Sequence, residues 1–447
     1  MVNTKEFWIA LVVSVVVYWR LPVRMRSWFL AITSFAYVAY VEWWQATDNT
    51  PVDVKLGAAA LAVFAAAFYL VSQRLRGRPP ALVVALICAV LAYLAYYKYF
   101  PAIYHAIVPK KGEPGAAAAL AVPLGASYFT FKLVHYAIES SRTHFGPDKV
   151  ERPNVSKHDW GTFLSYVFFF PTFTAGPIER FETQATPASG QPLGWMRSRV
   201  ERLTRADLVE ALTRVMYGLI KKFVIVDLVL GKTSVAFERP TWVDALPLYN
   251  SPLKLEQLLQ DLPAISPLFV WQFLVNKFLT TYIDFSAYSD IAIGCALLFG
   301  VRVMENFDWP IFARNIGDFW KRWHISLSSW CQQYVYLPMI GRTRNPYIAV
   351  YATQLAIGVW HMGNANYLSW GAYHATLMVT YLTWGRIKRK KKWKLRGKPL
   401  EYAGILLTFL CVTVGHAFVS TSEVGMRPAL RLLAKLFGID VFVPGAA

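Results

Sequence analysis

The stretch W-H-M-G-N-A-N-Y-L-S-W-G-A-Y-H (residues 360–374) places one histidine at the end of a short apolar segment and a second within the next. Between them lies a small polar turn that contains Gly363, Asn364 and Asn366. An ionisable side chain inside a membrane-spanning sequence is costly and marks a functional site by default. His361 is therefore a candidate reactive centre.

The composition excludes an ordinary soluble protein. Of the 447 residues, 55% are hydrophobic and 16% aromatic, and the apolar residues come in long runs. Such runs are typical of a polytopic α-helical membrane protein. No polar stretch between them is long enough to fold alone. We expect a single integral-membrane domain (1–447), made of N-terminal helices (1–112), a core (113–385), and a basic loop, last span and amphipathic C-terminal tail (386–447).

The formal net charge of +19 does not indicate a nucleic-acid partner. The Lys and Arg residues cluster in short loops between apolar runs, where cytoplasmic loops of membrane proteins carry them. The four cysteines lie apart without C-x-x-C spacing, so neither a disulfide framework nor a zinc site is expected. We therefore expect membrane lipid, and no nucleic acid, as a partner.

Hydropathy predicts about ten crossings. Residues 163–178 are too short and too rich in Pro and Gly to cross as a helix, so we expect a re-entrant or surface segment there. The run at 7–19 lacks a cleavage site and is interpreted as a retained span. The predicted crossings are 7–19, 28–44, 56–71, 81–97, 115–138 (interrupted at Pro123 and Gly125), 215–237, 266–300, 347–360, 367–384 and 402–418.

Three stretches depart from simple spans. Residues 266–300 would extend ~50 Å as a helix, beyond a ~30 Å hydrocarbon core, so we expect this segment to be tilted or broken, with Asp284 and Asp290 turned inward. Residues 197–214 are predicted as a surface helix. Residues 315–337 carry an apolar stripe with Trp320 and Trp330, which predicts one amphipathic helix along the membrane surface. His324 falls on the flank of this helix.

The depth of His361 separates it from the other histidines. It follows Asn345 by 16 positions, or ~24 Å of helix, and so lies inside the ~30 Å core if the span begins at Asn345. It then has to face a polar cavity. A structural histidine bonded to a backbone carbonyl is an equally open interpretation. His374 is expected to be part of the scaffold.

The sequence indicates which chemistry this histidine can support. No histidine pair at helical spacing completes a metal site, and no Gly-x-Ser-x-Gly elbow or phosphate loop is present. A histidine without a serine or cysteine nucleophile suits direct transfer, in which it takes a proton from a hydroxyl that attacks an activated acyl group.

Five segments together resemble the membrane-bound O-acyltransferase family. The similar branch is that of alginate O-acetyltransferase membrane subunits, related to the teichoic acid D-alanyl transfer protein. The segments are F-F-P-T-F-T-A-G-P-I-E-R-F (169–181), Y-I-D-F-S-A-Y-S-D-I-A-I-G (282–294), M-E-N-F-D-W-P (304–310), D-F-W-K-R-W-H-I-S-L-S-S-W (318–330) and W-H-M-G…W-G-A-Y-H-A (360–375). Met362 stands where the family usually has glycine, and Gln332 and Gln333 stand where it often has Arg-Asp.

The resemblance implies an all-α bundle of about 10–11 transmembrane helices, with re-entrant and amphipathic surface helices, around a central funnel. His361 would be the general base, and His324 a second catalytic residue on the route of the acyl donor. By their place in the motifs, seven residues are expected to line the substrate and donor channel: Asp284, Tyr288, Asp290, Arg322, Trp323, Trp360 and Asn364. For the two aspartates, capping and inter-helix hydrogen bonds are the competing interpretation.

The same resemblance implies an O-acyltransferase in a bacterial cytoplasmic membrane. The donor would be acetyl-CoA or an acyl-carrier-protein thioester, with no bound cofactor. The acceptor would be an extracytoplasmic polysaccharide or cell-wall polymer, and the expected partner is an SGNH-type transferase. Transfer of D-alanyl or another acyl group from a carrier is an alternative. A transporter or lipid-handling protein is a further one, motivated by the polar stretch around Asp284 and Asp290. The basic run at 386–394 either anchors to anionic lipid or binds the donor.

Overall fold

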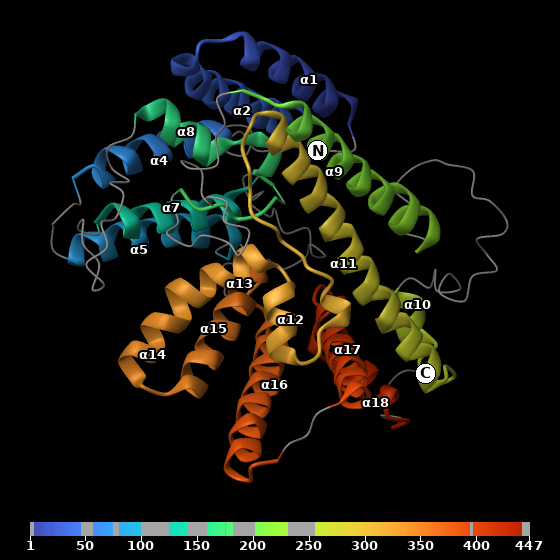
Figure 1. Ribbon diagram of the computed structural model, residues 1–447. Coiled ribbons are helices and arrows are strands. Elements are labelled where there is room, and N and C mark those ends of the chain that lie inside the picture. The colour runs from blue at the N-terminus through green and yellow to red at the C-terminus, as the bar shows by residue number, and fades with distance from the viewer. Residues whose placement is uncertain are drawn as a thin grey trace, which may run out of the picture. The chain divides into compact units, whose positions relative to one another are not determined.

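The computed structural model describes residues 4–45, 57–74, 80–99, 125–141, 159–174, 176–181, 202–230, 255–393 and 397–439 (Figure 1). Across these ranges the regular structure is helical and contains no strand, which confirms the prediction of an all-α protein. The main helices are α1 (Lys5–Arg20), α2 (Val23–Gln45), α4 (Gly57–Ser72), α5 (Pro80–Lys98), α7 (Ala126–Ser141), α8 (Trp160–Phe168), α9 (Arg205–Leu219), α10 (Leu255–Gln260), α11 (Pro267–Leu298), α12 (Ile316–Arg322), α13 (Ile325–Cys331), α14 (Leu337–Thr343), α15 (Pro346–His361), α16 (Ala365–Lys390), α17 (Lys398–Ser420) and α18 (Met426–Leu436).

The chain divides into two compact units. Unit 1 comprises residues 1–217 and 288–304, and unit 2 comprises residues 218–287 and 305–447. The helix α11 therefore contributes its first part to unit 2 and its last part to unit 1. The single domain with its three sections stays a prediction.

Unit 1 is built around aromatic side chains. Phe7 of α1, Tyr37 of α2 and Phe170 make mutual ring contacts, with centroids 5.3–5.9 Å apart. Large aromatic rings bury much apolar surface and pair favourably edge to face. The helix α8 ends at Phe168 and is followed by a 3-10 turn at Phe170–Thr172, and the re-entrant or surface segment expected at 163–178 stays a prediction.

The predicted interruption of the fifth run is seen at its glycine. Gly125 has φ +73°, a conformation that favours glycine, and α7 begins directly after it. A Cβ at this position would lie 2.8 Å from the backbone oxygen of Phe173. Pro123 and the first half of this run lie outside the described residues.

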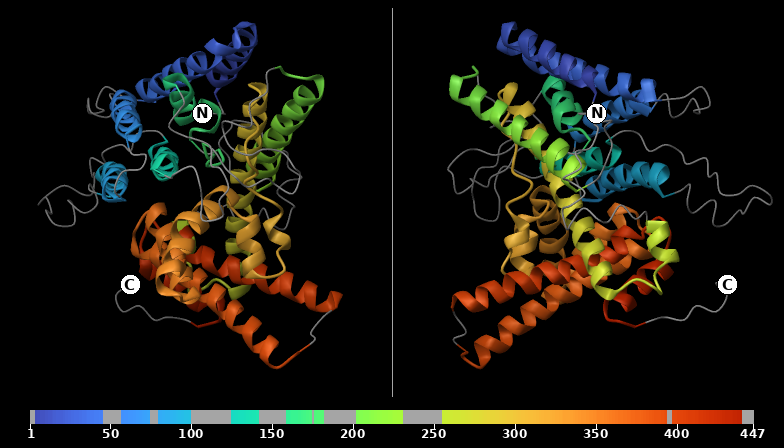
Figure 2. Two further views of the ribbon diagram at one scale, coloured as in Figure 1. Left: turned by 60° about the vertical axis from the view of Figure 1, so that its left-hand side comes forward. Right: turned by 90° about the vertical axis from the view of Figure 1, so that its right-hand side faces the viewer.

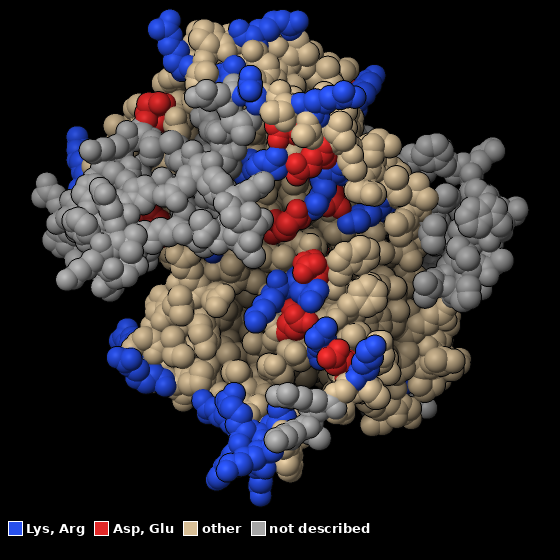
Figure 3. Space-filling model, viewed as in Figure 1, with Lys and Arg blue, Asp and Glu red and all other residues tan. Residues whose placement is uncertain are grey.

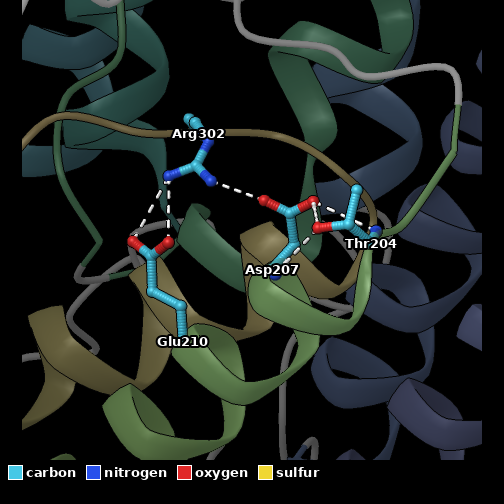
Figure 4. Close-up of polar contacts among 4 residues, drawn as sticks. All are labelled: Thr204, Asp207, Glu210 and Arg302. Carbon is cyan, nitrogen blue, oxygen red and sulfur yellow. Dashed lines mark hydrogen bonds and ion pairs between the residues drawn. The ribbon is translucent and has the colours of Figure 1, made fainter.

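A charged contact ties α9 to the chain that follows α11 (Figure 4). The Arg302 guanidinium donates to Asp207 and Glu210 of α9. Asp207 also accepts from the Thr204 hydroxyl at 2.6 Å, and its own N–H donates to that hydroxyl at 3.1 Å, a reciprocal N-terminal cap. The hydrogen bonds from Thr204, together with Arg302, hold the pKa of Asp207 below its usual value against the opposing effect of burial.

Asp207 should therefore contribute pH-dependent stability. Because its folded-state pKa is depressed, the contribution is complete above the unfolded value of about 3.9 and is lost as the pH falls through the lower folded value. We expect Asp207→Asn to lower the melting temperature at pH 7, and the difference from wild type to shrink below about pH 4. Thermal unfolding across pH measures it. The exposed Glu210→Gln should have little effect, and a gap that does not change with pH would contradict the assignment.

In unit 2, α15 and α16 form a tightly packed hairpin, and α16 also packs against α17 (Figure 2). Gly358 and Gly371 lie where the two backbones meet. A Cβ on Gly358 would lie 2.5 Å from the Tyr367 oxygen, and a Cβ on Gly371 would lie 2.6 Å from the Gln354 oxygen. Since both clashes are with backbone, no side chain can give way.

This close approach predicts opposite effects at two glycines of α16. Gly371→Ala should destabilise the protein by about 1–3 kcal/mol, because the new methyl group overpacks the helix contact. Gly385→Ala meets no atom within 4 Å and should be neutral or slightly stabilising, since alanine favours the helix. Thermal unfolding in detergent compares the two variants. Equal melting temperatures would show that the hairpin is looser than described.

The amphipathic C-terminal tail predicted within 386–447 is the helix α18. Its buried face joins α10, α11 and α17 in one apolar cluster that contains Leu258, Phe273, Ala417 and Leu432. The basic run ends α16, and Arg389, Lys390, Lys391 and Lys392 are exposed there, where Figure 3 shows Lys and Arg side chains gathered.

One sequence prediction needs correction, together with part of a second. The stretch 315–337 is not one helix but α12, α13 and a π-helical turn at Gln332–Tyr336, with a break at Trp323 and His324. For 266–300, the broken alternative is wrong because α11 is unbroken, and the tilted alternative stays a prediction. The helix α9 continues past residue 215 into a π-helix at Ile220–Val229, and the surface helix and span predicted on either side of that point stay predictions.

Two helices of the described residues are long and apolar enough to cross a membrane, one within α5 at Ala81–Lys98 and the other α17. Apolar side chains are also exposed along α1, among them Ile9, Val12 and Val13. Contiguous exposed apolar surface of this kind is unfavourable in water and marks contact with lipid or another protein.

Candidate active site

His324 lies in the break between α12 and α13. Trp323 is extended, and His324 has φ +43° and ψ +54°, in the left-handed region that a bulky residue rarely adopts. The side chain is buried, with 2% of its surface exposed. Residues held in such conformations cost energy and cluster at functional sites.

Asn306 holds this break in place. Its side-chain oxygen lies 3.0 Å from Nδ1 of His324, and it accepts from the backbone N–H of Ser326 at 3.3 Å and from the Ser326 hydroxyl at 2.9 Å. Its backbone oxygen accepts from the N–H of Ile325 at 2.8 Å. One fully buried residue therefore binds three consecutive residues of the turn.

Aromatic rings enclose the His324 imidazole. The Phe285 ring meets it at 90° with centroids 4.8 Å apart, and the rings of Trp360 and Phe307 lie at 6.2 and 6.5 Å. Burial in these apolar surroundings, with a further effect of His361, lowers the pKa of His324 to about 3. The imidazole is thus neutral at physiological pH and can accept a proton or a hydrogen bond.

His361 is the last residue of α15, before the turn at Gly363. The half-buried ring stacks on Tyr367 with centroids 5.0 Å apart and planes 19° apart. Trp370 meets it at 90° and 5.6 Å. Both aromatic residues come from α16, so the hairpin that Gly358 and Gly371 allow also fixes the plane of this imidazole.

The structure brings some predicted channel residues to this centre. Trp360 contacts the rings of both histidines, at 6.2 Å from His324 and 4.6 Å from His361. Trp323 stacks on Phe319 at 5.5 Å, next to the break. Their role as channel residues remains a prediction.

Other predicted residues make structural contacts. Arg322 donates from Nε to Asp318 at 3.0 Å and from Nη1 to the backbone oxygen of Asp308 at 3.1 Å. Asn364 caps α16 by accepting from the N–H of Tyr367 at 3.0 Å, and it donates to the oxygen of Ser422 at 2.9 Å. These contacts support the fold around the centre.

The two aspartates of α11 are ion-paired. In unit 2, Asp284 lies 3.0 Å from Nζ of Lys222. In unit 1, Asp290 lies 2.7 Å from Nε of Arg214, and the half-buried Tyr288 belongs to the same unit. These contacts agree with the inter-helix interpretation of the aspartates.

Lys222 and Asn306 were not predicted. Lys222 is 3% exposed and also pairs with Asp227 at 3.2 Å, so its charge lies between two carboxylates. A lysine inside an apolar run was the signal available for it in the sequence. Asn306 lies in the M-E-N-F-D-W-P segment, but only its long-range contacts reveal what it does.

Known proteins resemble this chain in sequence over the residues that form the site. Residues 254–419 match the sequence model of the membrane-bound O-acyltransferase family and include both His324 and His361. A probable alginate O-acetylase of Pseudomonas putida is 28% identical over 93% of this chain and 74% of its own length. A teichoic acid D-alanyltransferase of Streptococcus thermophilus is 29% identical over 66% of this chain and 68% of its own. A peptidoglycan O-acetyltransferase of Helicobacter pylori is 26% identical over 72% and 58%.

These relatives all transfer acyl groups, and the class of this protein is therefore that of the acyltransferases. Residues 254–419 form a domain of the membrane-bound O-acyltransferase family.

Proposed function

We propose that the protein moves an acetyl group from a cytoplasmic thioester toward an extracytoplasmic polysaccharide or a partner transferase, with His361 as the general base. The observation that carries this proposal is the position of His361. Its ring is fixed between Tyr367 and Trp370 at the end of α15, with the buried, neutral His324 close enough to interact electrostatically.

The chemical step follows from these groups. A ring nitrogen of His361 takes the proton of the acceptor hydroxyl while the oxygen of that hydroxyl attacks the thioester carbonyl. The new C–O bond forms, the C–S bond breaks, and the thiolate leaves and is protonated to the free thiol. His324 and the aromatic rings around it exclude water, which would otherwise hydrolyse the thioester.

The relatives support a polymer acceptor and leave the donor open between two classes. Acetyl transfer to alginate or peptidoglycan is compatible with acetyl-CoA as the donor, and D-alanyl transfer to teichoic acid with a charged carrier protein, although the names of the relatives give only the group and the acceptor. We propose the first as the function and the second as the alternative. A transporter has less support, because α11 is unbroken and both Asp284 and Asp290 are ion-paired.

We also propose the membrane arrangement that this function requires. The chain would cross a bacterial cytoplasmic membrane in about 10–11 spans around a central funnel. An SGNH-type transferase on the outer side would receive the acyl group. The length and apolar composition of α5 and α17 support membrane insertion, and the exposed lysines at the end of α16 suit the cytoplasmic face.

The donor is tested with the purified protein in two parallel reactions. One contains acetyl-CoA with a labelled acetyl group, and the other contains a carrier protein charged with labelled D-alanine. We expect acceptor labelling from acetyl-CoA by the wild type and not by His361→Ala. Labelling from the carrier alone would select the alternative, and proton-coupled flux in liposomes without acyl transfer from either donor would overturn both.

A further inference from the structure

The hydrogen bonds of Asn306 determine where the proton of His324 lies. The backbone N–H of Ser326 is always a donor, so the atom 3.3 Å from it has to be the amide oxygen of Asn306, not the nitrogen. The same oxygen faces Nδ1 of His324 at 3.0 Å. An oxygen that only accepts requires Nδ1 to donate, and a neutral imidazole carries one proton.

The other ring nitrogen is therefore an acceptor. Within the part of the chain that the structure describes, Nε2 of His324 is buried and has no hydrogen-bond partner. Buried polar atoms are nearly always paired, and an unpaired one calls for an explanation such as a catalytic role or a ligand that is not present. The groups packed around it are the rings of Phe285, Phe307 and Trp360, with His361 as the titratable neighbour.

We propose that Asn306 is a positioning residue, which locks His324 in the Nδ1–H tautomer so that Nε2 accepts a hydrogen bond from a hydroxyl or amide N–H of bound substrate. This inference rests on the proposed function, since it places substrate beside His324. It gives the two histidines different tasks. His361 takes the proton in the transfer step, while His324 orients substrate and does not donate from Nε2.

A purely structural role for Asn306 is the competing explanation. Its contacts to residues 324, 325 and 326 also hold the left-handed turn, so its loss would disturb the fold around the site. Activity alone does not separate the two explanations. The tautomer of His324 does, because it changes only if Asn306 sets the proton position.

The test measures the ring nitrogens of His324 by NMR in full-length protein labelled with ¹⁵N-histidine, with the signal assigned from its loss in His324→Phe. We expect a protonated Nδ1 and an unprotonated Nε2 in the wild type. Asn306→Asp keeps an oxygen acceptor and should keep this tautomer and most of the turnover. Asn306→Leu removes the acceptor and should shift the proton toward Nε2, with turnover reduced about 10–100-fold, as for outer partners of functional histidines.

Ser326→Ala is the matched control, because it removes the hydroxyl contact to Asn306 but keeps the backbone N–H and the His324 contact. It should keep the tautomer of His324 unchanged, and its turnover should stay within a few-fold of the wild type. A wild-type His324 protonated on Nε2 would overturn the inference, and so would Asn306→Leu with an unchanged tautomer. If Asn306→Leu does not fold, the wild-type and Asn306→Asp tautomers decide.

The variant His361→Ala distinguishes a failure of the proposed function from a failure of the assignment of Asn306. It should abolish turnover and leave the His324 tautomer unchanged. Retained turnover in this variant would remove His361 as the base while the assignment of Asn306 still stood on the NMR result. A changed tautomer would instead show that His361, and not Asn306, sets the proton on His324.

Discussion

Replacement of His361 by alanine should lower the turnover number for acyl transfer by about 10²–10⁴-fold, the usual contribution of a positioned general base. The protein should still fold, because the ring is half-buried and its neighbours Tyr367 and Trp370 remain on α16. The KM for the thioester should change little, since the base acts on the acceptor hydroxyl. Steady-state kinetics with labelled acetyl-CoA gives both parameters.

His374 provides a matched control on the same hairpin. It is 1% exposed and packs against the rings of Trp320 and Trp370, with centroids 5.3 and 4.8 Å away. His374→Phe keeps an aromatic ring in that place and should retain turnover within a few-fold. The base assignment fails if His361→Ala retains near-wild-type turnover, or if both variants lose it equally at full folding.

Lys222→Met should destabilise unit 2 by about 3–5 kcal/mol, the cost of leaving buried charges without their partner. In the wild type the ammonium group lies 3.2 Å from Asp227 and 3.0 Å from Asp284, and it is shielded from water on all sides. Methionine has a similar length but no charge, so the two carboxylates would lose the ammonium group that lies between them. Denaturant unfolding in detergent measures the loss.

A variant that neutralises the whole cluster tests this explanation. Lys222→Met combined with Asp227→Asn and Asp284→Asn removes every charge and should recover most of the lost stability, because replacing a complete buried ion cluster is often neutral. The exposed Lys321→Met in α12 should cost less than about 0.5 kcal/mol, as expected away from a buried network. No recovery in the triple variant would mean that the lysine acts through packing instead of charge.

Hydropathy predicted the helices well where tertiary contacts do not alter them. The apolar run at 347–360 corresponds to α15 and the run at 402–418 to α17, each extended by one to four residues at its ends. Capping residues lie directly outside such ends: Asn345 precedes α15, and its side chain accepts from the N–H groups of Tyr347 and Ile348. Capping residues are polar, and a hydropathy window therefore ends before them.

The break at His324 could not be predicted from its own neighbourhood. No glycine or proline lies within 318–331, and the periodic stripe of tryptophans favours one helix. The turn exists because Asn306, eighteen positions earlier, binds the backbone and side chains of the residues around it. Sequence periodicity has no information about such a distant partner. The prediction that His324 lies on the flank of one continuous helix was therefore wrong, and its selection as a site residue stays a prediction.

The ion-pair partners of the two aspartates in α11 could not be predicted from the sequence either. The sequence identified Asp284 and Asp290 as polar residues inside an apolar segment, but not their partners. Lys222 is 62 residues away from Asp284 along the chain. A buried carboxylate needs a cation or hydrogen-bond donors, yet the residue that provides them is fixed by the packing of helices.

The contact between Gly358 and the Tyr367 backbone limits how the reaction can proceed. Because the two backbones meet three residues before His361, the backbone at His361 cannot shift toward a distant substrate without separating the hairpin. On the proposed function, we expect the acyl group to travel instead, carried on the long flexible arm of its thioester. A donor with a shortened arm should then fail to react although its thioester is chemically intact.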